Sequence, residues 1–131
     1  MGCPAPTGSP GEPSPAEALS EPLSPPTHLP EPIPSPARNA PTLAGITLGR
    51  HLFYEPLLSG DGAVSCATCH QQARAFTDGE RLGTSGVSGE PLKRHAPTLA
   101  NVAWIPALFW DGGGSNLESQ AFAPLTHPDE M

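Results

Sequence analysis

The feature that most limits how this chain can fold is the uneven distribution of its prolines. Thirteen of the 19 prolines lie in residues 1–41, in runs such as PAPTGSPGEPSP and PEPIPSPARNAP. Proline has no backbone N–H, and a segment with so few apolar side chains cannot bury enough surface to offset its ordering entropy. We therefore predict a disordered Pro-rich tether over residues 1–41 and one small folded domain over residues 42–131.

The periodic patterns in residues 42–131 are short and helical. The run TLAGITLGRHLFYE places Leu43, Ile46 and Leu52 near one face of a helix that Pro56 ends. Ser65 can cap a short helix that carries the sequence C-A-T-C-H. Because alternating strand patterns are nearly absent, the predicted fold class is all-α, with long loops between short helices.

Two further helical segments are predicted near the end of the chain. Pro97 begins a helical turn in APTLANVAW. Ser115 and Glu118 form a capping-box pattern, which opens a helix that Pro124 is expected to close.

The motif with the clearest chemistry is Cys66-Ala67-Thr68-Cys69-His70. Cysteines three apart on a helical turn point to one side, so both thiols can bond to the vinyl groups of one haem. The adjacent histidine can then bind the iron axially, which is why C-x-x-C-H is the attachment signal of c-type haem. We predict one covalent haem c, with thioethers at Cys66 and Cys69 and with His70 as an iron ligand.

Two other kinds of site also use a C-x-x-C pair. A structural zinc site needs four ligands, usually with a second paired set, but Cys3 lies in the tether and His95 and His127 have no paired spacing. A thioredoxin-like redox pair expects a βαβ context, which the patterns lack. Haem c is therefore the favoured interpretation.

The second axial position of the iron separates an enzyme from an electron carrier. Electron-transfer cytochromes usually fill it with methionine or a second histidine. The only methionines are Met1 and Met131; His51 is expected to face solvent, and His127, the best spare ligand, precedes a proline. The residues favour an open iron site that binds a small oxidant. The alternative is a mono-haem electron carrier or redox sensor without peroxidase activity.

Three segments together resemble the N-terminal half of the bacterial di-haem cytochrome c peroxidase/MauG family. They are LGRHLFYEPLLSGDGAVSCATCHQQARAFTDG, RHAPTLANVAW and ALFWDGGGSNLESQAFAPLTHPDEM, and they cover about residues 43–131. The resemblance implies a small cytochrome c-like helical domain that reduces hydrogen peroxide, or forms a high-valent iron, with electrons from a second haem or a partner protein.

The resemblance also implies roles for individual residues. His70 matches the proximal ligand of the peroxidatic haem, and Trp110 matches a tryptophan that relays electrons between the two haems. Gln120 and Pro124 match residues of the distal pocket, and Glu130 matches a carboxylate that manages protons while peroxide is cleaved. Cleavage of O–O needs a group that takes a proton from one oxygen and returns it to the other, which a carboxylate can do. Taken singly, Trp110 would be interpreted as a core aromatic, and Gln120 and Glu130 as solvated polar groups. Their joint spacing favours a catalytic site.

The chain departs from the family pattern at several positions. The loop DGERLGTSGVSG has no histidine of the kind that closes the peroxidatic haem in many members, which favours a MauG-like haem that is open without reductive activation. His95 replaces an asparagine linked to interdomain calcium, so calcium is doubtful, and Gly113 replaces an arginine. The second half of the family, which carries its own C-x-x-C-H motif, does not follow in this sequence. The chain is therefore expected to be a piece of a longer or split protein, a lone domain of altered function, or a nonfunctional fragment.

Composition limits the partners and the location. The net charge of -7 argues against nucleic acid as a partner and permits charge steering of a small basic donor, such as a cytochrome c or cupredoxin. No apolar run is long enough to span a membrane.

The start of the chain indicates an exported protein. The run MGCPAPTGSPGEPSP resembles the remnant of a bacterial lipoprotein signal, so we expect a periplasmic protein that is lipidated at Cys3 and whose true start lies upstream; the alternative is a stray cysteine. The myristoylation pattern fails at Pro6.

Overall fold

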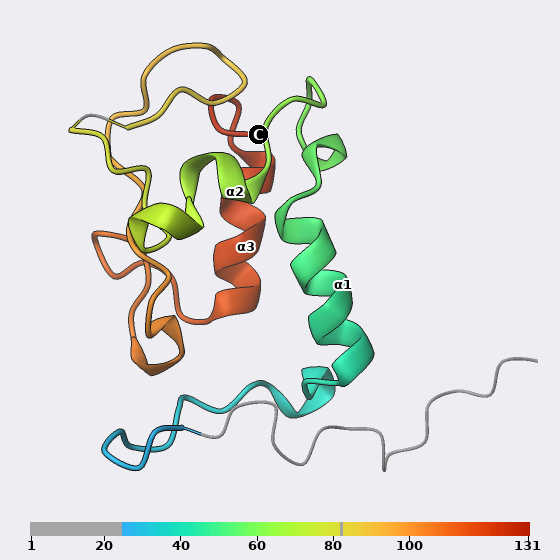
Figure 1. Ribbon diagram of the computed structural model, residues 1–131, viewed down its shortest axis with the longest axis vertical. Helices are drawn as coiled ribbons and strands as arrows, with labels where there is room; N and C mark the ends of the chain where they lie inside the picture. The colour runs from blue at the N-terminus through green and yellow to red at the C-terminus, as the bar shows by residue number, and fades with distance from the viewer. Residues whose placement is uncertain (1–24, 82) are drawn as a thin grey trace, which may run out of the picture.

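Figure 1 shows the computed structural model, which describes residues 25–81 and 83–131. Within them, the α-helices are α1 (Leu43–Phe53), α2 (Cys66–Cys69) and α3 (Leu117–Thr126). Short 3-10 turns are η2 (Ala37–Asn39), η3 (Pro56–Leu58), η4 (Gln72–Arg74) and η5 (Val102–Trp104). Isolated β-bridges pair Gln71 with Thr77, Ser85 with Pro91 and Leu108 with Gly114. The predicted all-α class with long loops is confirmed.

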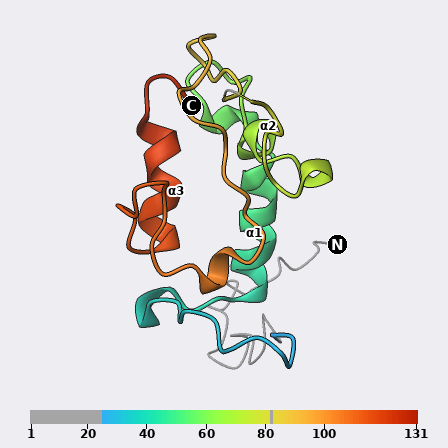
Figure 2. The same ribbon diagram turned by 90° about the vertical axis from the view of Figure 1, so that its left-hand side faces the viewer.

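Helices α1 and α3 lie side by side, and the C-terminal residue lies beside the loop that precedes α2 (Figures 1 and 2). Helices α1 and α3 run alongside one another in Figures 1 and 2, and the segment that leads from the loop at the top down to η5 passes beside both. The C-terminal residue returns to the loop before α2, where the Gly60 N–H donates to the carbonyl oxygen of Met131. No helix in the described part is long and apolar enough to cross a bilayer.

Helix α1 has the limits that its sequence predicts. The Thr42 hydroxyl accepts the Gly45 N–H at 3.0 Å, so Thr42 is the N-cap. The helix ends at Phe53, before Pro56. Its apolar side chains are not buried by the rest of the described chain, however, since Leu43 is 62% and Leu48 is 58% exposed.

Helix α3 corrects two predictions. Its N-cap is Asn116 and not Ser115, because the Asn116 Oδ1 accepts the Ser119 N–H at 2.8 Å and asparagine is among the best N-cap residues. Pro124 lies inside the helix and does not close it. Proline removes one helical donor, but the last turn is held by the Thr126 hydroxyl, which donates to the Phe122 carbonyl oxygen at 2.9 Å.

The turn predicted to begin at Pro97 starts later. The 3-10 turn η5 spans Val102–Trp104 and follows Asn101, whose φ is 59°. The Thr98 hydroxyl donates to the Ala75 carbonyl oxygen at 2.6 Å and accepts the Ala100 N–H at 3.0 Å. This local side-chain bonding competes with helix formation and leaves the residues after Pro97 non-helical.

The described part of the predicted tether contacts the domain. The Trp104 Nε1–H donates to the Pro30 carbonyl oxygen at 2.8 Å, and the Ile33 N–H donates to the Ala103 carbonyl oxygen at 2.9 Å. Asn39 also donates to the Glu118 carboxylate at 3.1 Å. A disordered tether is therefore not confirmed over residues 25–41. Residues 1–24 of the tether, with Cys3, lie outside the described residues.

The buried interior combines a few apolar side chains with one carboxylate. In the described residues, the buried hydrophobic side chains are Val64, Leu108 and Met131, whereas the most buried side chain of all is Asp78, at 1% exposure. Large apolar side chains such as Leu57 and Phe122 stay 80% and 66% exposed. The loops are thus organised by polar contacts as much as by apolar packing.

Candidate haem-binding site

Helix α2 presents the two thiols on one side of a single helical turn. The Ser65 N–H donates to the Thr68 hydroxyl at 3.0 Å, and the His70 N–H donates to the Cys66 carbonyl oxygen at 2.9 Å. This capping box begins the turn and the second bond closes it. Because residues three apart on a helix are neighbours, Cys66 and Cys69 share a face; both are free thiols and half-buried.

Burial keeps both thiols uncharged at neutral pH, and nearby carboxylates add to this effect at Cys69. Burial raises the pKa of Cys66. Burial is also the largest cause of the raised pKa of Cys69, and the negative charges of Asp78 and Glu130 add to it. The folded chain therefore brings Glu130, from its last residues, into electrostatic reach of the C-x-x-C-H turn.

The imidazole of His70 is oriented for metal binding. Its Nδ1 lies 2.9 Å from the Phe76 carbonyl oxygen. A carbonyl oxygen only accepts hydrogen bonds, so Nδ1 carries the proton and Nε2 keeps its lone pair for a metal. This donor set, an oriented imidazole beside two thiols on one helical face, fits a covalent haem c.

The turn after the motif is built to direct that carbonyl at the ring. Ala75 and Phe76 both have left-handed backbone angles, with φ of 55° and 60°. The Phe76 N–H donates to the Gln71 carbonyl oxygen at 2.9 Å, which folds the turn back on α2. The Phe76 ring packs edge-to-face on Phe53, with 6.2 Å between centroids, and so joins the turn to the end of α1.

Asp78 organises the loop that follows, a role that the sequence analysis did not assign. Its carboxylate accepts the backbone N–H groups of Glu80 at 3.2 Å, Thr84 at 3.2 Å and Ala96 at 3.1 Å. Burial by itself would raise the pKa of Asp78, but these three bonds and the charge of His95 outweigh burial, and the pKa is lowered. An aspartate before a glycine, at the start of a long polar loop, is the signal that could have identified it.

The predicted distal residues lie on α3 and in the segment after it. The Gln120 Oε1 is buried and has no hydrogen-bond partner among the described residues, which leaves an acceptor available to a ligand. Pro124 follows one helical turn later and is half-buried, as is Glu130. The structure thus places Gln120 and Pro124 on the same side of α3; their catalytic roles stay predictions.

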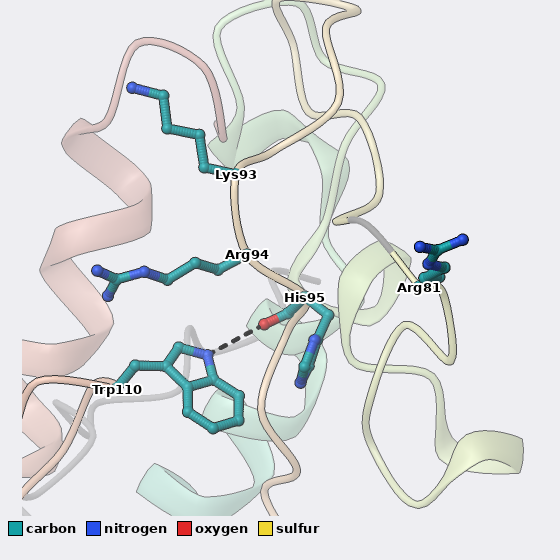
Figure 3. Close-up of a pocket in the computed structure, with 5 residues that line it drawn as sticks. All are labelled: Arg81, Lys93, Arg94, His95 and Trp110. Atoms are coloured by element: carbon teal, nitrogen blue, oxygen red, sulfur yellow. Dashed lines mark hydrogen bonds between the residues drawn. The ribbon is translucent and has the colours of Figure 1, made fainter.

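Trp110 lies at the edge of a basic cavity. Its Nε1–H donates to the His95 carbonyl oxygen at 3.3 Å, and its ring meets the His95 ring edge-to-face at 4.9 Å. The cavity has a volume of about 340 Å³, and its lining residues are Arg81, Lys93, Arg94, His95 and Trp110. Figure 3 shows that Arg94 and Lys93 extend toward α3, whereas Arg81 lies on the opposite side. Trp110 itself is 55% exposed, so it is not a core aromatic.

The family model for di-haem cytochrome c peroxidase matches residues 43–131. The chain belongs to this family. Among its relatives, the methylamine utilization protein MauG of Methylorubrum extorquens is 44% identical over 102 residues, which are 78% of this chain and 29% of that protein. The cytochrome c peroxidase Ccp of Escherichia coli is 36% identical over 107 residues, which are 81% of this chain and 23% of that protein.

Solved structures of the di-haem peroxidase family give the same result. A MauG-like protein associated with microbial copper homeostasis has a TM-score of 0.75 and 38% identity, over 82% of this chain and 31% of that one. The diheme peroxidase BthA from Burkholderia thailandensis has a TM-score of 0.62 and 32% identity, over 70% and 27% of the two chains. The present chain therefore spans less than a third of the length of these peroxidases and MauG proteins.

Proposed function

We propose that this chain forms the part of a di-haem peroxidase that carries the peroxidatic haem. One haem c would be bound through Cys66 and Cys69, with His70 as its axial ligand. The observation that carries the proposal is the His70–Phe76 hydrogen bond of 2.9 Å, since it leaves Nε2 free for iron directly beside two thiols on one helical face.

The residues that the family resemblance assigns to the distal pocket would supply the groups that peroxide reduction needs. The reaction consumes one hydrogen peroxide, two electrons and two protons and releases two water molecules; the haem supplies the redox chemistry when it is bound. The Glu130 carboxylate would accept the proton from one peroxide oxygen and return it to the departing oxygen. The unpaired Oε1 of Gln120 would accept a hydrogen bond from peroxide and orient it.

Electrons would enter through Trp110. Its exposed ring lies at the surface of the described residues, where a second-haem domain or another protein can approach it. A small basic donor, such as a cytochrome c or a cupredoxin, is favoured by the net charge of -7. The exposed apolar side chains of α1 and α3 would be covered in the complete protein, because contiguous apolar surface marks interaction sites.

The location is also a proposal. Haem c attachment implies export, so we propose a periplasmic protein with Cys3 as a lipidation site. Sequencing the reading frame upstream of Met1 tests this: an apolar segment in frame supports a lipoprotein signal, and a frame without one removes the proposal for Cys3.

The test of the proposed function is the absorption spectrum of the protein matured with a haem c attachment system. It is recorded in the ferric state, in the ferrous state and after hydrogen peroxide is added. We expect a covalently bound haem with a high-spin ferric spectrum. This spectrum should change when hydrogen peroxide is added. A low-spin haem that is inert to peroxide would point to the mono-haem electron carrier or redox sensor, and absence of covalent haem would refute the assignment of Cys66 and Cys69.

Two variants then test the proton-transfer role. Glu130→Gln is expected to slow the reaction with peroxide by about 100-fold or more, in the range that general acid–base catalysis contributes. Glu90→Gln is the matched control, because Glu90 is an exposed carboxylate. Equal rates in the two variants would contradict the role of Glu130.

A further inference from the structure

The short segment that carries Glu130 is held by the backbone of two loops. The Val87 N–H donates to the Glu130 carbonyl oxygen at 3.3 Å, and the Gly60 N–H donates to the carbonyl oxygen of Met131. The Glu130 N–H donates to the His127 carbonyl oxygen at 3.2 Å, which turns the chain at the end of α3. Glu130 is therefore fixed at its backbone and is not a solvated charge on a free end.

The loop that contacts this segment approaches it at a glycine. A β-carbon added at Gly86 would lie 2.5 Å from the carbonyl oxygen and 2.7 Å from the Cα of Glu130, and closer still to the Asp129 carbonyl oxygen. All three are backbone atoms, so no change of side-chain rotamer could make room. Only a residue without a β-carbon lets the loop and the segment pack at this distance.

The other side of the loop is fixed in the same way. A β-carbon added at Gly83 would lie 2.7 Å from the Leu92 Cβ and would overlap the Arg94 carbonyl oxygen. The adjacent Thr84 N–H donates to the Asp78 carboxylate at 3.2 Å. The loop cannot simply move away from a larger residue at position 86, because its base is anchored to the buried carboxylate.

The carboxylate that this contact supports is the one to which the proposed function assigns proton transfer. Glu130 is half-buried, and the hydrogen bond from Gly60 to Met131 ties its segment to the loop that precedes α2. A displacement of the Glu130 backbone would therefore move the carboxylate relative to the haem-binding turn. Misplacing a reacting group by about 1 Å can cost about 100-fold in rate.

We propose that Gly86 is a positioning residue for Glu130. By allowing backbone-to-backbone contact, it seats the loop of residues 83–91 against the segment 129–131 and so sets the position of the Glu130 carboxylate. The proposal rests on the proposed function, in which Glu130 transfers protons to peroxide.

The experiment compares Gly86→Ala with Gly89→Ala in the haem-loaded chain. Gly89 is a matched control in the same loop: its φ is 74°, so alanine strains the backbone there, but a β-carbon would meet no atom within 4 Å. Stopped-flow absorption measures the rate at which peroxide changes the haem spectrum, across a pH series. We expect Gly86→Ala to react with peroxide about 10–100-fold more slowly than the parent. The pH dependence of its rate should resemble that of Glu130→Gln. Gly89→Ala should react at the rate of the parent.

Two further measurements separate this proposal from the role of Glu130. Hydrogen exchange should show that the Val87 amide loses protection in Gly86→Ala and keeps it in Gly89→Ala; retained protection in Gly86→Ala would overturn the proposal whatever Glu130 does. The double variant Gly86→Ala/Glu130→Gln should react no more slowly than Glu130→Gln alone. If Gly86→Ala slowed the Glu130→Gln variant by the same factor as it slows the parent, the positioning role of Gly86 would also be overturned. If Glu130→Gln reacts like the parent while Val87 loses protection, the proton-transfer role fails and the positioning contact stands.

Val87→Pro covers the case in which Gly86→Ala takes up no haem. It removes the N–H that donates to Glu130 without adding an atom at position 86. We expect a smaller loss of rate in the same direction, and a rate equal to that of the parent would contradict the positioning role.

Discussion

Replacing Asp78 by alanine should destabilise the domain more than any other single change of a polar side chain in this loop. The carboxylate is 1% exposed and accepts three backbone N–H groups over a span of 18 residues. Each buried donor that loses its partner costs about 1–3 kcal/mol. Water can reach these partly buried donors, so the low end applies, and the sum is about 3 kcal/mol. This is a large share of the roughly 5–15 kcal/mol that stabilises a typical domain.

Asp78→Asn gives a graded test of the same reasoning. The Asp78 Oδ2 accepts the Thr84 and Ala96 N–H groups, and Oδ1 accepts the Glu80 N–H. An asparagine whose oxygen faces Thr84 and Ala96 loses only the bond from Glu80, one of three, so about a third of the destabilisation is expected. The measurement is urea unfolding of the haem-loaded chain, followed by circular dichroism. Glu80→Gln is the control, because its exposed ion pair with Arg74 contributes about 0–1 kcal/mol.

The destabilisation should also depend on pH. The pKa of Asp78 is lower in the folded state than its ordinary value of 3.8. The stabilisation by its charge is therefore present above about pH 4 and is lost as the pH falls through the folded pKa. The difference in unfolding free energy between the parent and Asp78→Asn should narrow as the pH is lowered below 4. A difference that is the same at pH 7 and pH 3, or an Asp78→Ala variant within about 0.5 kcal/mol of the parent, would refute this account.

The remaining predictions concern the helices and the site. Asn116→Ala should lower the unfolding free energy by about 1 kcal/mol, because the N-cap of α3 is lost. Gly49→Ala should raise the unfolding free energy by about 0.5–1 kcal/mol, because Gly49 lies in the middle of α1 and a β-carbon there meets no atom within 4 Å. Urea unfolding measures both changes. Gly114→Ala should cost about 1–3 kcal/mol, since its β-carbon would lie 2.9 Å from the Leu108 Cβ, which cannot rotate away. The β-carbon would also lie 2.8 Å from the Gln120 Oε1 and displace it, so the peroxide reaction should slow. An unchanged unfolding free energy and an unchanged rate would contradict the packing. Cys66→Ser should leave haem held by one thioether, seen as a shifted pyridine haemochrome band, and a spectrum identical to that of the parent would contradict the attachment.

The helices that could be predicted are those whose limits depend on neighbouring residues. Thr42 and Pro56 bracket α1, and Ser65 begins α2, because capping and proline effects act within one turn. Helix α3 starts one residue later than the pattern predicts, since Ser115 and Asn116 are both good caps and only the folded geometry chooses between them. It also ends later than predicted, because the Thr126 hydroxyl supports a last turn beyond Pro124.

The spacing of Cys66, Cys69 and His70 is enough to predict two thiols on one helical turn with an imidazole directly after it, because this geometry is local. The family motifs likewise indicate Trp110, Gln120 and Glu130. Three contacts could not be predicted and appear only in the folded chain: the Phe76 carbonyl at His70, the bond from Ala96 to Asp78, and the loop at Gly86 against Glu130. The physical reason is that these contacts join segments whose approach depends on loop closure and on backbone space, and no periodicity or short motif encodes either.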